Sequence, residues 1–150
     1  MSLAVDVSVD GRRSPLAAAR VAEIARATLR AERVRDAMVS IALVPARAMA
    51  ALNRRHLGRP GATDVIAFAF APAGAAGPVV GDVYICPEVA RANARAHGVG
   101  VREELARLVV HGTLHVLGYD HPHGEDRARS SMWQRQERLV GRALRRGSRS

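Results

Sequence analysis

The feature that most constrains this chain is a histidine pattern, His-Gly-Thr-Leu-His-Val-Leu-Gly-Tyr-Asp-His, over residues 111–121. His111 and His115 are four residues apart, so a helix would project both rings from one face. Gly118 follows the last expected turn and permits the positive φ that reverses the chain, which can return His121 to the same point. Three converging imidazoles are the ligand set of a catalytic zinc site with an open fourth position. We therefore expect one Zn²⁺ per chain, held by His111, His115 and His121.

Two other interpretations of this pattern must be weighed. An isolated H-x-x-x-H pair is compatible with a buried helix whose histidines bond backbone carbonyls, but that leaves the return to His121 unexplained. Zinc peptidases of the H-E-x-x-H type place a glutamate base directly after the first histidine. Here that residue is Gly112, which cannot move a proton. The base must come from elsewhere, or the metal must do most of the work by lowering the pKa of its water to roughly 7.

The same eleven residues resemble the signature of the YbeY family, bacterial metal-dependent endoribonucleases that act in ribosomal RNA maturation. Two upstream blocks resemble the family at the same spacing: Leu52-Asn53 followed by Thr-Asp-Val-Ile-Ala-Phe over 63–68, and Gly-Asp-Val-Tyr-Ile-Cys-Pro-Glu over 81–88. The resemblance covers residues 38 to 140, approximately. It implies a zinc-dependent single-strand endoribonuclease in ribosomal RNA maturation and ribosome quality control, with RNA and ribosomal subunits as partners.

The chain departs from the family in the first of these blocks. Leu57 stands where the family has an arginine that is thought to help cleave RNA, and His56 stands where it has a tyrosine. Arg59 retains the positive charge of a family lysine, so we take Arg59 as a candidate catalytic residue. By the resemblance, the substrate-binding candidates are Arg54, Arg55, His56, Thr63 and Asp64. Thr63 and Asp64 could instead cap a backbone turn.

Asp120 immediately precedes the third expected ligand and is the other candidate catalytic residue. It would either hold a ligand imidazole by its second nitrogen or transfer a proton to the metal-bound water. His123 and Glu125 are further candidate bases or part of a helix cap. Two alternative functions stay open: a non-catalytic, zinc-stabilised ribosome-assembly factor, which Leu57 favours, and a zinc hydrolase of another substrate.

Charge and composition agree with an RNA partner. The formal net charge is +9 and every basic residue is an arginine, and such a domain attracts phosphate backbones and displaces their counterions. Aromatic residues make up only 3%, which argues against base stacking as the main mode of recognition. No apolar run is long enough to span a membrane and no signal peptide is evident. The single cysteine, Cys86, excludes an intrachain disulfide, so we expect a buried thiol and a cytoplasmic protein.

Hydrophobic periodicity and turn residues predict an alternation of strands and helices. Strands are expected at 3–9, 38–44, 65–70 and 80–86, and helices at 15–33, 47–56, 87–98, 101–117 and 125–145. The last helix carries Met132, Gln136 and Leu139 on one side. Residues 71–78 join two strands whose antiparallel pairing is plausible, but periodicity leaves the strand order open.

These elements predict one α/β (α+β) domain over residues 1–150, with a basic tail from about 145. The family resemblance implies a small four-stranded mixed sheet covered by helices, with a zincin-like metal helix at the cleft.

Overall fold

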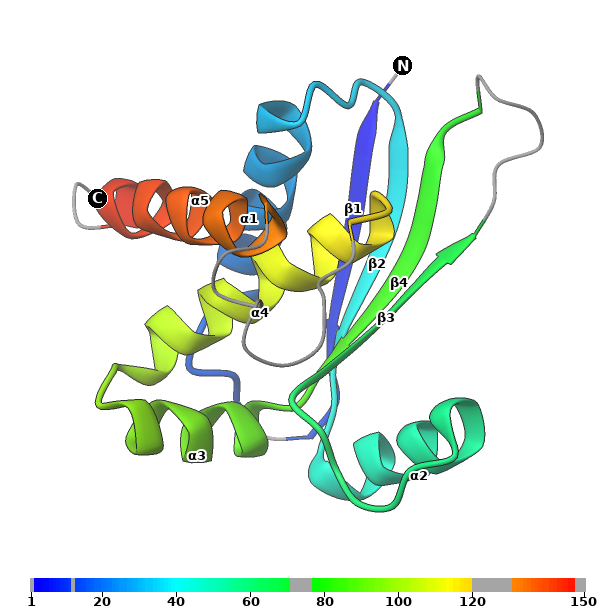
Figure 1. The fold of residues 1–150 in the computed structure, drawn as a ribbon, viewed down its shortest axis with the longest axis vertical. Coiled ribbons are helices and arrows are strands. Elements are labelled where there is room, and N and C mark those ends of the chain that lie inside the picture. The colour runs from blue at the N-terminus through cyan, green and yellow to red at the C-terminus, as the bar shows by residue number, and fades with distance from the viewer. Residues whose placement is uncertain (1, 12, 71–76, 120–130, 148–150) are drawn as a thin grey trace.

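The fold is known from a computed structural model that describes residues 2–11, 13–70, 77–119 and 131–147 (Figure 1). Each predicted strand and helix is present in these ranges, in the predicted order, and the expected start of the last helix at residue 125 lies outside them. In chain order the elements are β1 Leu3–Val9, α1 Ala18–Ala31, β2 Ala37–Leu43, α2 Ala46–Leu57, β3 Val65–Phe70, β4 Val79–Ile85, α3 Pro87–His97, α4 Val101–Val116 and α5 Ser131–Gly147.

The four strands form a single mixed sheet in the order β1-β2-β4-β3. β1 and β2 are parallel with Val5 opposite Val39, and β2 and β4 are parallel with Ile41 opposite Val83. β3 pairs antiparallel with β4, where Ala67 lies opposite Val83. The predicted mixed sheet and the antiparallel pairing of its last two strands are therefore confirmed.

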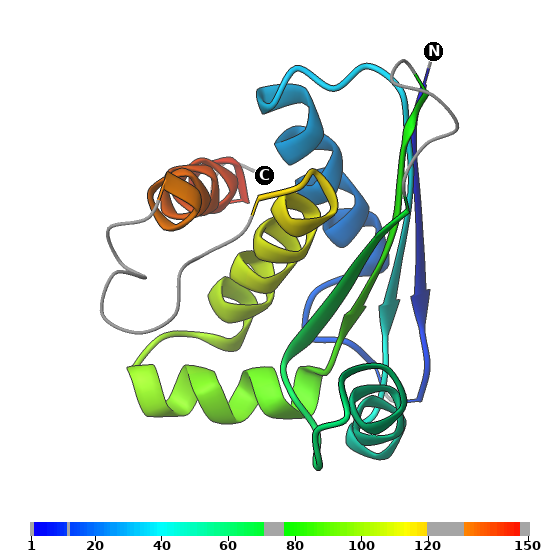
Figure 2. The ribbon, with the colours of Figure 1, turned by 45° about the vertical axis from the view of Figure 1, so that its right-hand side comes forward.

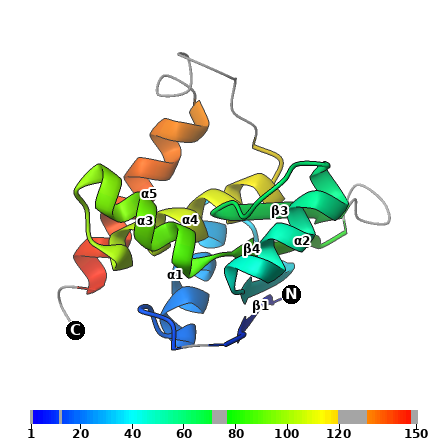
Figure 3. The same ribbon diagram turned by 90° about the horizontal axis from the view of Figure 1, so that it is seen from below.

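α1, α4 and α5 lie in two layers on one face of the sheet, and α2 packs against the opposite face near one end. α4 packs against β3, β4 and α1, while α5 packs on α4 at the side away from the strands (Figure 2). α2 and α3 lie at the same end of the sheet (Figure 3). No helix within the described residues combines the length and apolar character that crossing a bilayer requires.

Alternation along the strands decides which face is buried. On β2, Val39, Ile41 and Leu43 are at most 2% exposed and belong to the core under α1 and α4, whereas Met38 on the opposite face is 60% exposed. Full burial of such a side chain stabilises the fold by about 1.5–3 kcal/mol.

A smaller core lies between α2 and the sheet. It contains Val44, Met49, Ile66 and Cys86, with Phe68 and Tyr84 packed against it. Cys86 is fully buried as predicted, and burial raises the pKa of its thiol. A buried thiol of raised pKa is a structural rather than a reactive cysteine.

Two helices differ from their predicted bounds by more than one residue. α1 begins at Ala18 rather than 15, because the Ser14 hydroxyl accepts a hydrogen bond from the Leu16 amide (3.2 Å) and holds a turn there. It ends at Ala31 because Arg33 takes a left-handed conformation, with φ of 61°. At the other end of the chain α5 continues to Gly147, so the helix includes residues that the sequence suggested for a basic tail.

α4 crosses the sheet at a distance that only glycine permits. A Cβ added to Gly112 would lie 2.5 Å from Val83 Cγ1, and one added to Gly81 would lie 2.5 Å from Val116 Cγ1. Contacts this short do not occur between real carbon atoms, so both positions require a hydrogen in place of a side chain. The position that holds the glutamate base in H-E-x-x-H peptidases therefore faces the sheet in this chain.

We predict that Gly112→Ala destabilises the protein although alanine favours helices. The matched control is Gly141→Ala on α5, where the added Cβ meets only the flexible end of Arg145 at 3.3 Å. Both variants gain up to about 1 kcal/mol of helix propensity, but overpacking at Gly112 costs about 1–3 kcal/mol. Urea unfolding should show Gly141→Ala equal to or above wild type and Gly112→Ala clearly below Gly141→Ala. Equal free energies of unfolding for the two variants would contradict the close approach.

Candidate metal centre and its cleft

His111 and His115 lie one turn apart near the C-terminal end of α4, as the motif predicted. Their ring centroids are 4.6 Å apart at an interplanar angle of 70°, and both residues are half-buried. The helix then ends in a Schellman-type turn. The Tyr119 amide donates to the Leu114 carbonyl (3.1 Å), and the amide of Gly118, at φ of 100°, donates to the His115 carbonyl (3.0 Å). The predicted reversal of the chain directly after the helix is therefore present.

The third expected ligand lies outside the described residues. His121, Asp120, His123 and Glu125 all fall in 120–130, so their predicted roles stay predictions. Among the residues that the structure does describe, no three side chains of histidine, cysteine, aspartate or glutamate form a metal-binding group. The structure thus brings together one pair of the expected ligand set, His111 with His115.

A cleft of about 580 Å³ opens beside His111. It lies between the start of β3 and the helices α3, α4 and α5. Asp64 enters it from the chain just before β3, where Asn93 Nδ2 donates to its Oδ2 (3.1 Å) and the Thr63 hydroxyl to its Oδ1 (3.4 Å). Polar residues dominate the lining, which includes Asp64, Asn93, His97, Glu104, Arg107, His111, Gln136 and Glu137.

Gln136 of α5 is a residue of the site that the sequence analysis did not identify. Its side chain is buried, at 2% exposed. Its Oε1 lies 2.6 Å from His111 Nδ1, and its Nε2 donates to Glu137 Oε2 (3.1 Å). A glutamine within the apolar side of a helix was the available signal, because a buried amide requires hydrogen-bond partners.

Arg107 joins α4 to α5 on the same side of the cleft. Its Nε and Nη2 donate to the two carboxylate oxygens of Glu137 (2.9 and 3.0 Å), and it also contacts Glu103 and Glu104. Burial alone would raise the pKa of the Glu137 carboxyl, but hydrogen bonds from Arg107 and Gln136 and the charge of Arg107 outweigh it, so this pKa is lowered. The hydrogen bond to Glu137, opposed by burial, raises the pKa of Arg107. Glu137 is therefore a firmly charged acceptor.

The candidate residues from the end of α2 lie apart from this cleft lining. Arg54, Arg55 and Arg59 are exposed and do not line the cleft. The His56 ring packs edge-on against Phe68 with centroids 5.0 Å apart, which gives it a structural contact.

A hydrogen bond holds the loop that follows α2 against the helix. The buried Asn53 donates from Nδ2 to the Gly61 carbonyl (2.9 Å). Leu57, at the last position of the helix, is 49% exposed. The loop thus runs from the arginines of α2 to Asp64 in the cleft.

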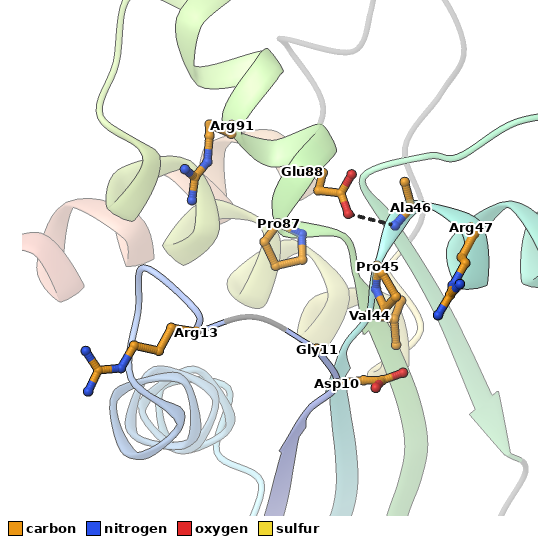
Figure 4. A pocket seen from close by; sticks show the side chains of 10 residues that line it. All are labelled: Asp10, Gly11, Arg13, Val44, Pro45, Ala46, Arg47, Pro87, Glu88 and Arg91. Atoms are coloured by element: carbon orange, nitrogen blue, oxygen red, sulfur yellow. Dashed lines mark hydrogen bonds between the residues drawn. The ribbon is translucent and has the colours of Figure 1, made fainter.

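A second hollow, of about 750 Å³, lies where β1, β2 and β4 end (Figure 4). Arg13, Arg47 and Arg91 border it, and Glu88 Oε1 accepts a hydrogen bond from the Ala46 amide (3.2 Å) at the start of α2. None of its described lining residues is a histidine or a cysteine. The Glu88 carboxylate is already engaged by the amide at the start of α2. The cleft beside His111 is therefore the better candidate for a metal centre.

Comparison with known proteins identifies the family. A sequence model described as Endoribonuclease YbeY matches residues 9–143. This chain belongs to the YbeY family. Endoribonuclease YbeY of Anaeromyxobacter sp. (strain Fw109-5) is 40% identical over 149 residues, which cover 97% of this chain and 78% of that protein. Endoribonuclease YbeY of Anaeromyxobacter dehalogenans (strain 2CP-C) is 42% identical over 144 residues, with 93% and 73% covered.

A solved structure agrees with the fold. The solution structure of TM1509 from Thermotoga maritima matches with a TM-score of 0.64 and covers 96% of this chain and 91% of that chain. The sequence identity of 24% limits this likeness to the architecture. The resemblance to the YbeY family that the sequence motifs indicated is thus confirmed, and so is the fold class.

The Arg107–Glu137 pair predicts how stability changes with pH. Because the folded pKa of Glu137 is lowered from the ordinary 4.5, its contribution is fully present above that value and is lost as pH falls through the folded pKa. Glu137→Gln should therefore be less stable than wild type at pH 7, and the difference should shrink steadily below pH 4.5. Urea unfolding at several pH values measures it. Glu23→Gln, which removes an exposed pair with Arg20, should show little difference at any pH; a constant gap for Glu137→Gln would contradict the assignment.

Proposed function

We propose that this chain is a zinc-dependent endoribonuclease that cleaves single-stranded segments of ribosomal RNA during maturation and quality control of the ribosome. Membership of the YbeY family confirms the predicted activity class, an endoribonuclease and hence a hydrolase that acts on RNA. The observation that carries the metal part of the proposal is the pair of adjacent imidazoles, His111 and His115, on a helix that reverses at Gly118.

The residues present fit a zinc ion in their donor chemistry. Two imidazoles on one helix face, followed by a tight reversal and a third histidine in sequence, match the three-nitrogen set of catalytic zinc sites. His111, His115 and His121 would hold the ion, which supplies Lewis-acid chemistry toward a phosphodiester when bound. Asp120 would orient a ligand imidazole or accept a proton.

In this proposal, positively charged side chains bind the phosphate and stabilise the charge that develops on it. Arg59 would stabilise the charge that develops on the phosphoryl group, and Arg54 and Arg55 would hold the strand. His56, Thr63 and Asp64 complete the proposed substrate side, of which Asp64 lines the cleft. The net charge of +9 supports electrostatic attraction of RNA. We place this activity in the cytoplasm, with ribosomal subunits as partners.

The metal site is tested by the zinc content of purified protein. We predict one zinc per chain, bound by ring nitrogens at roughly 2.0–2.1 Å, and its loss in His115→Ala. His97→Ala is the matched control because His97 is an exposed histidine of the same cleft and should leave zinc content unchanged. A full equivalent of zinc in folded His115→Ala would remove His115 from the ligand set.

Activity is tested by cleavage of structured ribosomal RNA, with His115→Ala purified in parallel to exclude contaminating nucleases. Wild type should cleave, and a chelator or the His115→Ala substitution should abolish cleavage. Zinc binding without cleavage would favour the assembly-factor alternative. Hydrolysis of small esters or peptides but not of RNA would favour the other alternative, a zinc hydrolase of a different substrate.

The substitution at Leu57 should limit the rate. Leucine cannot donate a hydrogen bond, and one missing donor at a catalytic site costs on the order of 10²–10³ in rate. Leu57→Arg should therefore increase the cleavage rate, by up to about that factor, with unchanged zinc content. Because Leu57 is 49% exposed, the substitution should be tolerated by the fold.

Met38→Arg is the matched control for this experiment, since it adds the same charge at an exposed position of β2. It should leave the cleavage rate unchanged. If Leu57→Arg has no effect while Arg59→Ala abolishes cleavage, the catalytic charge resides on Arg59. An equal increase in both arginine variants would mean that the gain comes from net charge rather than from position 57.

A further inference from the structure

Three side chains form a continuous chain of hydrogen bonds that ends on His111. Arg107 holds both carboxylate oxygens of Glu137, Glu137 Oε2 accepts from Gln136 Nε2 (3.1 Å), and Gln136 Oε1 lies 2.6 Å from His111 Nδ1. We call Arg107, Glu137 and Gln136 the amide relay. It connects α4 to α5, and Gln136 is the buried member of the three.

The relay fixes which way the Gln136 amide points. A charged carboxylate can only accept hydrogen bonds, so Glu137 must face the NH₂ group of Gln136. The opposite orientation would place the Gln136 oxygen against the carboxylate, and the buried amide would lose its partner. Arg107 keeps Glu137 charged and fixed in place because it donates hydrogen bonds to both carboxylate oxygens. The carbonyl oxygen of Gln136 is therefore directed at His111.

An oxygen acceptor directed at Nδ1 decides the tautomer of the imidazole. Gln136 Oε1 can only accept, so His111 Nδ1 must carry the proton, and in a neutral imidazole the lone pair then resides on Nε2. A histidine whose Nδ1–H is held by a fixed acceptor is the arrangement that orients a ring for metal binding through Nε2. The hydrogen bond also fixes the rotation of the ring about its Cβ bond.

We propose that the amide relay is a positioning device that sets the Nδ1–H tautomer of His111 and thereby raises the affinity of the site for zinc. This inference rests on the proposed function, in which His111 is a zinc ligand. Gln136 acts through His111 and Glu137 acts through Gln136, so neither needs to touch the metal or the RNA.

The experiment measures zinc affinity and tautomer separately in the full-length protein. Zinc dissociation constants come from competition with a chromophoric chelator, with zinc ion alone as the probe. The tautomer of His111 in the zinc-free protein comes from nitrogen-15 chemical shifts at a pH where its ring is neutral. The variants are Gln136→Met, which preserves volume and removes the acceptor, and Glu137→Gln, which removes the fixed charge. Glu103→Gln is the matched control, because Glu103 contacts Arg107 but no other residue of the relay.

In wild type, His111 should carry its proton on Nδ1. Gln136→Met should weaken zinc binding by about 10- to 100-fold and shift His111 toward the Nε2–H tautomer that free histidine prefers. Glu137→Gln should move both measurements in the same direction by a smaller factor, while Glu103→Gln leaves both unchanged. If Gln136→Met does not fold, Glu137→Gln at the half-buried surface carries the test.

Two results would overturn the proposal and are distinguishable from failure of the proposed function. Wild type that binds zinc, together with folded Gln136→Met and Glu137→Gln that bind it within twofold, would overturn the relay alone. An Nε2–H tautomer of His111 in wild type would overturn it as well. A wild-type chain that binds no zinc would overturn the metal site itself, and the relay with it.

Discussion

The close contact between α4 and the sheet determines where the candidate ligands point. Gly112 faces Val83 so closely that no side chain fits between them. Successive residues of an α-helix are about 100° apart, so with Gly112 toward the strands, His111 and His115 lie about 100° and 60° to the same side. Both rings therefore project along the flank of α4 rather than into the sheet. The contact that excludes a glutamate at position 112 is thus also the contact that orients the two histidines.

α5 completes the site although it lies in the outer layer. Apolar residues of α5 such as Met132 and Leu139 join the main core, and ion pairs fix the position of the helix. Arg135 donates to Glu32 Oε2 (2.6 Å), and the Tyr119 hydroxyl donates to the other oxygen of the same carboxylate. Removing one partner of an ion pair of such low exposure leaves the other charge uncompensated, so these contacts favour one arrangement of the two elements. Glu32 therefore anchors both Tyr119, in the turn that follows α4, and Arg135, in the first turns of α5.

Local sequence patterns were sufficient to predict the local elements of this fold. The spacing of His111 and His115 and the glycine at 118 predicted the helix and its reversal, because both depend on neighbours within one or two turns. The strand order could not be predicted, since placing β4 between β2 and β3 depends on pairing across distant segments. The sequence alone shows Gly112 only as a missing base, because its contact with Val83 joins separate elements. Helical spacing places Gln136 on the apolar side of its helix but does not reveal its partner His111, which is 25 residues away in the sequence.

Packing and helix electrostatics distinguish the residues around Leu57, which stands where the family has an arginine. The exposed Leu57 side chain gains little from burial, so packing in the described structure does not account for the leucine. Arg54 and Arg55 lie in the last turn of α2, where the helix dipole favours a positive charge whatever the protein does. Arg59 lies beyond Gly58, whose left-handed conformation has already ended the helix. The dipole effect fades over that distance, so helix stability gives no reason for a cation at Arg59. An interaction with phosphate does give a reason for a cation at this position. Arg59, rather than its neighbours in the helix, is therefore the best candidate for the charge that the family arginine would have supplied.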